Sequence, residues 1–435
     1  MNRRTFAGFC AALLIAAAVQ PAVYAETVTE DPKQNLYLSA PVLETVASID
    51  LPSVLERALT DSNNLQLLLL KYAALNSKEQ DLKAQRESLV GGSFTGGHLP
   101  DTPEEMVAGM NAQGVAVDPA DNLWLGPVTT VTNKAINQLI QGMGTMSAGM
   151  NEIIQQQREQ LKTTAHQLST DQRNALLQKD EAVEAIRLQT TAQYVQLLGL
   201  KKQLAFMQDY ASVLDKEVKK AMLFREQGLA SNEDVLTATK ALNKHKDELA
   251  LLNQNYKLAL VQLSFDIGIA YNPSLEVKDI ANVTVEPVQR ADTETILKNA
   301  YQMKMSANNI DEAAWQQSNT VTQNTYGGNY LGVNLAISGK KNEQTQLELT
   351  KKIEAVYTEA ENAYLAYTTE ARNTAEVKAD LNKMKVRYDA GVLSRHDLQK
   401  FELKVRGQET TLEAAKLKYF VLREKARAME KGFIS

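Results

Sequence analysis

Residues 224–235 read FREQGLASNEDV, and residues 387–398 read RYDAGVLSRHDL. The two stretches lie 163 residues apart and share three identical positions, Gly228/Gly391, Ser231/Ser394 and Asp234/Asp397. Farther along, the same offset aligns two more identical pairs, Leu249/Leu412 and Tyr256/Tyr419. Because a fixed offset between similar segments is the mark of an internal repeat, we expect two homologous halves.

Apolar residues on both sides of each copy recur at alternating intervals of three and four residues. The first copy is preceded by Leu197, Leu200, Leu204, Met207, Ala211, Leu214, Val218 and Ala221, and the second is followed by Leu398, Phe401, Val405, Leu412, Ala415 and Tyr419. This spacing predicts long helices packed as antiparallel coiled-coil hairpins, and hence a mainly α fold. A helix with so narrow an apolar stripe needs a second hairpin or another subunit to cover it, which favours an oligomer.

The repeated residues fit the tip of such a hairpin. A glycine, Gly228 or Gly391, can take the positive φ that ends a helix. A serine three residues before an aspartate, Ser231 to Asp234 or Ser394 to Asp397, resembles a capping box with Asp in place of Glu. These six residues therefore shape the tips, and they are also our candidates for a docking or gating surface; the two roles are compatible.

The expected order of segments is a signal peptide at 1–25, an extended lead-in at 26–50, a first repeat at 51–268, a linker at 269–292 and a second repeat at 293–432. The first repeat is expected to hold an irregular or strand-forming insert at about 91–133 and a tip at about 228–234. The second repeat is expected to hold a strand region at about 319–339 and a tip at about 391–397. An opening helix is expected from Asp50-Leu51-Pro52-Ser53 onward, because proline suits the first turn of a helix.

Composition narrows the class of protein. Arg3 and Arg4, a short apolar core and the small residues before Glu26 predict an export signal. The one cysteine, Cys10, lies inside it, so the mature chain would have neither disulfides nor cysteine metal ligands. A net charge of −5 without a basic block argues against nucleic acid as a partner. No later apolar run is long enough for a spanning helix.

Motifs for catalysis or cofactor binding are not found, so we expect no enzyme, no cofactor and no metal site. The four histidines, His98, His166, His245 and His396, are scattered along the chain. His245 occupies a core heptad position and is interpreted as a polar residue that sets the register. His396 is expected at the solvated surface of the second tip, or alternatively to make docking pH-sensitive. The methionines of the Gly-rich stretch, Met143, Met146 and Met150, are interpreted as flexible packing residues rather than soft-metal ligands.

The duplicated tip, Gly-x-x-Ser-x-x-Asp followed by Val235 or Leu398, resembles that of the TolC family of outer-membrane efflux proteins. The opening helices, 51–65 and 293–308, are similar as well. The resemblance implies two halves, each with an opening helix, a strand pair and a helical hairpin. It also implies a passive homotrimeric conduit whose strands close an outer-membrane barrel and whose tips meet a periplasmic adaptor protein coupled to an inner-membrane pump. Asp234 and Asp397 match the motif aspartate.

The strand signal is weak for such a barrel. Tyr330–Ser338 alternates in polarity and could follow a turn at 327–329, but the first half offers only fragments at 93–95, 123–125 and 128–132. We therefore expect the barrel to be reduced, rearranged or absent. The alternative to a conduit is a non-conducting coiled-coil scaffold in the periplasm or at the cell surface.

Overall fold

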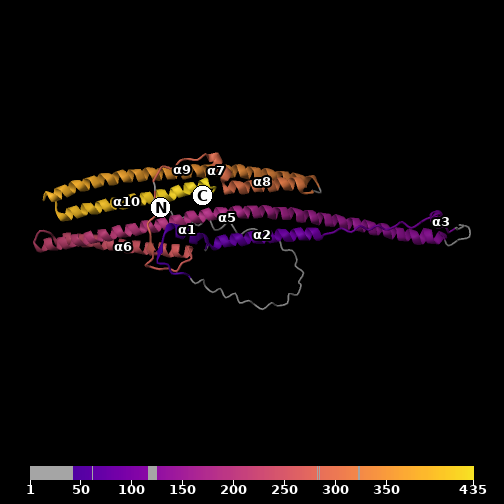
Figure 1. Ribbon diagram of the computed structural model, residues 1–435, viewed down its shortest axis with the longest axis horizontal. Coiled ribbons are helices and arrows are strands. Elements are labelled where there is room, and N and C mark those ends of the chain that lie inside the picture. Colours follow the sequence, from indigo (N-terminus) through magenta and orange to yellow (C-terminus); the bar gives the residue numbers. More distant parts are fainter. Residues whose placement is uncertain (1–42, 61, 116–124, 282, 284, 322–323) are drawn as a thin grey trace, which may run out of the picture. The chain divides into compact units, whose positions relative to one another are not determined.

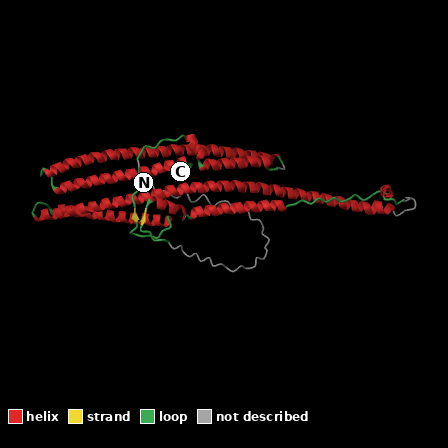
Figure 2. Ribbon diagram, in the orientation of Figure 1, coloured by secondary structure: helices red, strands yellow, loops and turns green. Residues whose placement is uncertain are grey.

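The computed structural model describes residues 43–60, 62–115, 125–281, 283, 285–321 and 324–435. The predicted signal peptide, with Cys10, and most of the lead-in lie outside the described residues. Within the described part, helices dominate and one pair of short strands is present (Figure 2). No helix of this part combines the length and the hydropathy that crossing a bilayer requires. The fold is mainly α, as the sequence predicts.

The elements of the described chain follow one another as in Figure 1. They are β1 (Ser48–Ile49), α1 (Leu51–Thr60), α2 (Asn63–Ser88), α3 (Pro103–Ala112), α4 (Leu125–Pro127), the π-helical η1 (Val128–Asn133), α5 (Lys134–Glu226), α6 (Asn232–Asp266), β2 (Glu276–Val277), α7 (Thr293–Asn299), α8 (Tyr301–Asn319), α9 (Thr325–Asp389) and α10 (Arg395–Glu430).

The opening helix of the first half begins where the sequence predicts. The backbone N–H of Ser53 donates to Asp50 Oδ1 at 3.0 Å, and the N–H of Asp50 donates to Ser53 Oγ at 3.3 Å. These bonds satisfy donors that would otherwise be unpaired at the helix start. The opening helix expected over 51–65 is divided into two helices, since Ser62 caps a new start by accepting from the N–H of Leu65.

The long helices pair as two antiparallel hairpins. Helix α5 packs against α6 in the first, α9 packs against α10 in the second, and α5 also packs against α10 across the two. The heptad positions are buried as predicted: Leu197, Leu204, Leu214, Val218, Leu242, Val405, Tyr419 and Met429 are all less than a tenth exposed. The coiled-coil prediction is confirmed for these helices.

Two apolar cores lie near the bases of the hairpins. The first contains Val54, Tyr194, Leu197, Leu198, Leu260, Leu263 and Ile267 of the first half together with Leu417 and Phe420 of α10. The second contains Ile296, Leu349, Ile353, Val356, Tyr357 and Met429. Strands β1 and β2 pair in parallel beside the first core, with Ser48 opposite Glu276. The hydroxyl of Tyr194, which is fully buried, donates to the carbonyl of Lys278 at 2.6 Å and so ties β2 to α5.

The strand predicted at Tyr330–Ser338 is wrong, because these residues belong to helix α9. The side chain of Asn324 caps this helix by accepting from the N–H of Gly327 at 2.9 Å, so the expected turn at 327–329 is the first turn of a helix. The alternating polarity did not distinguish the two structures. Leu331 and Leu335 are four residues apart, so they lie on the same face of a strand and also on the same face of a helix.

The insert of the first half also contains helix where strand fragments were expected. Residues 93–95 are neither strand nor helix, and 128–132 are π-helical and continue into α5. Residues 123 and 124 lie outside the described residues. Residues 134–170, which follow this insert, all lie in α5.

Candidate functional site

Both hairpin tips use the same backbone turn. Gly228 has φ 73° and Gly391 has φ 72°, the left-handed conformation that glycine adopts without steric cost. The N–H of Leu229 donates to the carbonyl of Phe224 at 2.8 Å, and that of Val392 to the carbonyl of Arg387 at 2.9 Å. These bonds close a Schellman motif at the end of α5 and of α9, so the predicted role of the glycines in the turn is confirmed.

The serine and aspartate of each tip cap the next helix. Asp234 N–H donates to Ser231 Oγ at 3.1 Å while Ser231 N–H donates to Asp234 Oδ2 at 2.8 Å, which makes a complete capping box. In the second tip, Asp397 N–H donates to Ser394 Oγ at 3.1 Å, and Ser394 Oγ donates to Asp397 Oδ2 at 2.6 Å. The backbone N–H of Ser231 lowers the pKa of Asp234, and the Ser394 hydroxyl lowers that of Asp397. Both carboxylates are therefore charged at neutral pH, and hydrogen bonds from the serines hold them in place.

Ion pairs between lysine or arginine and a carboxylate join α5 of the first hairpin to α10 of the second. We call three of them the inter-hairpin ladder; they are Lys202–Glu413, Asp209–Arg406 and Glu217–Lys400. Their positions step by seven and eight residues along α5 and by seven and six along α10, so each pair lies about two turns from the next. Because the two helices run antiparallel, the residue numbers rise on one helix as they fall on the other.

Lys202 is the most enclosed cation of the inter-hairpin ladder. Its Nζ lies 2.7 Å from Glu413 Oε1 and 3.4 Å from Asp279 Oδ1, and about a third of the side chain is exposed. Burial acts to lower the pKa of Lys202, but the hydrogen bond and charge of Glu413, with Asp279, raise it on balance. Lys202 also lines a groove of about 490 Å³ between α5 and α10. Paired charges next to this groove therefore add to the apolar contacts that Leu417 and Phe420 of α10 make with the core residues of α5.

The second tip is joined to the first hairpin through Glu217. His396 Nε2 lies 3.6 Å from Glu217 Oε1, and the same carboxylate accepts from Lys400. Only 18% of the His396 side chain is exposed, so its expected placement at the solvated surface is wrong. The cause is the packing of α10 against α5, which a single sequence does not reveal. Lys220 of α5 also lies close enough to contribute to the lowered pKa of Asp397.

His245 has the structural role that its heptad position predicts. It is buried, its Nε2 lies 2.8 Å from the carbonyl oxygen of Met207 on α5, and its ring meets Tyr210 edge-on at 4.6 Å. Gln408, at the equivalent position of the repeat, bonds Glu370 of α9 at 2.5 Å. At this matched position of the repeat, each hairpin therefore has a polar bond between its two helices.

The inter-hairpin ladder and two exposed residues of the tips escaped prediction from sequence. Leu229 is 71% exposed and Val392 is 68% exposed, each directly after the tip glycine. Both residues occupy the same position of the repeat, and this match could have revealed them from the sequence. Exposed apolar side chains at both tips are suited to contact with another protein.

A group of possible metal ligands lies away from the tips. In the part of the chain that the structure describes, His98, Asp101 and Glu105 offer ligand atoms that all lie within 4.8 Å of one another. His98 and Glu105 are exposed, and Glu105 accepts from the N–H of Asp101 at 3.2 Å as part of the start of α3. The sequence spacing of these residues at the start of a helix could have revealed the group.

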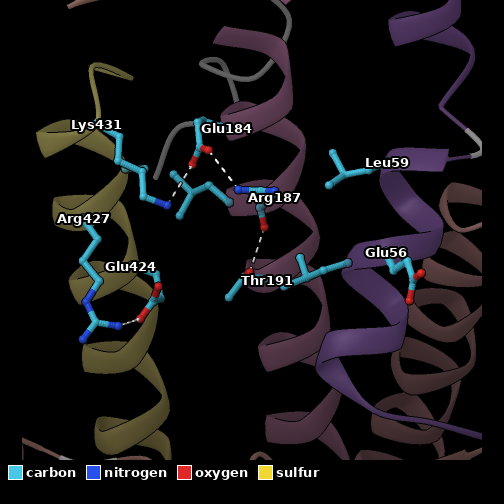
Figure 3. A pocket seen from close by; sticks show the side chains of 11 residues that line it. Glu56, Leu59, Glu184, Arg187, Thr191, Glu424, Arg427 and Lys431 are labelled. Atoms are coloured by element: carbon cyan, nitrogen blue, oxygen red, sulfur yellow. Dashed lines mark hydrogen bonds and ion pairs between the residues drawn. The ribbon is translucent and has the colours of Figure 1, made fainter. Parts of the chain in front are cut away.

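A separate pocket of about 580 Å³ lies between α1, α5 and α10 (Figure 3). Its charged lining consists of Glu56, Glu184, Arg187, Glu424, Arg427 and Lys431. Glu184 lies 3.1 Å from Arg187 and 3.7 Å from Lys431, and Arg427 lies 2.7 Å from Glu424. The three acidic and three basic groups leave the lining without net charge, and Leu55, Leu59 and Leu188 make the rest of it largely apolar.

Comparison with known proteins was made by sequence and by structure. No protein-family model matches the chain, and no curated protein matches it by sequence. Among solved structures, the Campylobacter jejuni CmeC outer-membrane channel has a TM-score of 0.56 at 12% identity, covering 96% of this chain and 96% of that one. The open state of the Neisseria gonorrhoeae MtrE outer-membrane channel has a TM-score of 0.56 at 13% sequence identity, and the match covers 97% of this chain and 98% of that one. The outer-membrane channel OprN has a TM-score of 0.55 at 11% sequence identity, and the match covers 88% of this chain and 90% of that one. The chain therefore has the TolC-like fold that its duplicated hairpin tips predict.

Proposed function

We propose that this protein is the channel component of an efflux or secretion system, exported to the outer membrane and periplasm. In this proposal a homotrimer forms a passive conduit, coupled through a periplasmic adaptor protein to an inner-membrane pump. The proposal is supported by the likeness in fold to outer-membrane channels over nearly the whole of both chains. The docking and gating role of Gly228, Ser231, Asp234 and their counterparts in the second tip is part of this proposal.

The observation that carries the mechanism is the inter-hairpin ladder. It joins two hairpins that carry the same tip, and it does so with polar contacts next to a groove. Helix pairs joined by a few discrete contacts can shift between two packed arrangements, as in other switching proteins. We infer that opening separates the second tip from α5 by breaking Glu217 away from His396 and Lys400.

One variant tests this step directly. Glu217→Gln removes the charge that both His396 and Lys400 contact, and we expect it to increase the fraction of time that the channel is open. Asp215→Asn is the matched control, because Asp215 pairs with Lys219 of the same helix and does not bridge the hairpins. An equal effect of both variants, or none from Glu217→Gln, would contradict the inferred opening step.

The second candidate function is a non-conducting coiled-coil scaffold. The observation that favours it is the helical structure of residues 330–338, for which the resemblance implied a strand. A scaffold would keep the hairpins, the tips and the oligomer but would pass no solute.

The experiment that separates the two is single-channel conductance of the purified mature protein in a planar bilayer. The oligomeric mass is measured in the same detergent. Stable trimers with discrete conductance steps would support the conduit. Trimers that never conduct and stay in solution without detergent would replace it with the scaffold.

A further inference from the structure

The four helices of the two hairpins lie in the order α6, α5, α10 and α9. This order follows because α5 packs against both α6 and α10, while α9 packs against α10. Helices α6 and α9 are therefore the two outer helices of this row. We call their exposed stripes the α6 edge and the α9 edge.

Each edge carries four exposed charged residues on one helix face. On the α6 edge they are Glu233, Lys240, Lys244 and Glu248. On the α9 edge they are Arg387, Asp380, Glu376 and Arg372. The residue numbers rise in steps of seven, four and four along α6 and fall in the same steps along α9. Steps of this size return to one face of a helix, so each set forms a single stripe.

The two stripes have complementary charges when the helices are laid antiparallel. Each acid of one edge then meets a base of the other, and the pairs are Glu233–Arg387, Lys240–Asp380, Lys244–Glu376 and Glu248–Arg372. Opposite charges that face each other in this way set the partner and the register of paired helices.

A slip of four residues, about one helical turn, would put like charges together. In one direction Lys244 would face Arg372, and in the other Glu248 would face Glu376. Like charges across paired helices are unfavourable, so the charges select one register.

The same register also fits the exposed apolar residues farther from the tips. Leu251 and Leu258 of α6 are 64% and 63% exposed, and Leu365 of α9 is 60% exposed. In this register Leu365 lies level with Asn255, between the two leucines of α6. One apolar side chain then inserts between two of the facing helix, as in a coiled coil. The charged stripe that continues this contact argues against lipid as its occupant.

We propose that the α6 edge of one copy packs antiparallel against the α9 edge of the next copy, in the register that pairs Glu233 with Arg387 and Glu248 with Arg372. The proposal rests on the homotrimer of the proposed function and names the surfaces that join its copies. Because two different edges meet, each copy uses one edge for each neighbour, and three copies close a ring with an open centre.

The direction and the height of the contact agree with such a ring. Within one chain α6 runs opposite to α9, since each is antiparallel to its own hairpin partner and α5 is antiparallel to α10. Rotation about an axis along the helices keeps both the direction and the height of every copy. In the proposed register Asn232, which begins α6, lies beside Tyr388, one residue before the end of α9. The tips of neighbouring copies are then nearly level.

Disulfide trapping in the full-length chain tests the contact. Cys10 is replaced by Ser, and two cysteines are introduced together by Leu251→Cys and Thr369→Cys, which face each other in the proposed register. A disulfide needs Cα atoms about 4.4–6.8 Å apart. The matched control combines Leu251→Cys with Asn362→Cys, whose cysteine is also at an exposed position of α9 but one heptad, or about 10 Å, away.

The expected result is linked dimers and trimers for the first pair, little linkage for the control pair, and none for Leu251→Cys or Thr369→Cys alone. Linkage of Leu251→Cys alone would mean that two α6 edges meet and would overturn the proposal. Equal linkage of the two pairs would overturn the register. Conductance of the same preparations keeps the two proposals apart. Linked trimers that pass no current would refute only the conduit, whereas conducting trimers without linkage would refute only this contact.

A charge exchange tests the register independently. Glu376→Lys puts a second lysine opposite Lys244, and adding Lys244→Glu restores an opposite pair. We expect Glu376→Lys to raise the protein concentration at half-assembly about two- to fivefold, as the range for surface ion pairs implies, and the double variant to reverse most of this rise.

Sedimentation in detergent measures the assembly of these variants. The control is Lys385→Glu, an exposed residue of α9 nine positions from Glu376 and hence on the opposite side of the helix. No recovery in the double variant, or an equal rise in the control, would overturn the proposed register.

Discussion

Reversing one charge of the inter-hairpin ladder should destabilise the protein, and reversing its partner should restore part of the loss. The perturbation is Lys202→Glu, followed by the double variant with Glu413→Lys. Lys202 is the best position because its ammonium contacts two carboxylates, those of Glu413 at 2.7 Å and Asp279 at 3.4 Å.

The size of the expected loss of stability follows from how exposed the two paired side chains are. Lys202 and Glu413 are 30% and 31% exposed, so their ion pair belongs at the upper end of the range of about 0.2–1 kcal/mol measured for surface pairs. Lys202→Glu loses that attraction and adds a repulsion of similar size, so we expect about 1–2 kcal/mol of lost stability. The double variant should regain only part of it, because the new carboxylate at position 202 still faces Asp279.

Equilibrium urea unfolding, followed by far-UV circular dichroism at one protein concentration, measures the effect. Adding Asp279→Asn to the double variant should recover most of the remaining loss, since it removes the last repulsion. If the double variant were no more stable than Lys202→Glu alone, the pair would not be formed in solution. The inter-hairpin ladder would then have no part in holding the hairpins together.

Other predictions test the tips and the core. Gly391→Ala should cost about 1–2 kcal/mol because a Cβ disfavours the left-handed conformation, whereas Gly339→Ala, inside α9 with open space around it, should stabilise; equal unfolding midpoints would contradict this. The pKa of Asp234 is lowered from 3.8, so its contribution to stability is present at neutral pH and is lost as pH falls through the lowered value. Asp234→Asn should therefore flatten the decline in stability measured below about pH 4, and an unchanged acid profile would refute the cap. Tyr194→Phe should cost about 1–2 kcal/mol in thermal unfolding because the carbonyls of Lys278 and of buried Ile49 lose their donor, while Tyr326→Phe, at an 83% exposed position, should be neutral; a neutral Tyr194→Phe would show that the bond is not formed.

The tips were predictable from sequence because their physics is local. A glycine at a helix end and a serine three residues before an aspartate act within one turn of backbone, so the residues alone predict the motif. The heptad stripes were predictable for a related reason, since Leu204 and Leu242 have no stable place except against a facing helix. The strand at 330–338 failed because alternating polarity over nine residues is compatible with either structure. Asn324 caps the helix that these residues form. Asparagine is common in turns as well as at helix starts, so the sequence alone did not identify it as a cap.

The inter-hairpin ladder could not be predicted, because it depends on which helices become neighbours. Nothing in the sequence near Asp209 points to Arg406, which lies almost two hundred residues later.

The two tips differ in a way that bears on how the proposed conduit would open. The first tip is self-contained, since the N–H of Ser231 is satisfied by Asp234 and its cap needs no other helix. Beside the second tip, His396 and Lys400 instead reach across to Glu217 of the first hairpin. Loss of that contact therefore frees the second tip from α5, while the caps of both tips keep their own bonds. We accordingly expect the hairpin of α9 and α10 to be the moving one. Spin labels on the two tips should separate in Glu217→Gln and stay together in Asp215→Asn; movement in both would assign the motion elsewhere.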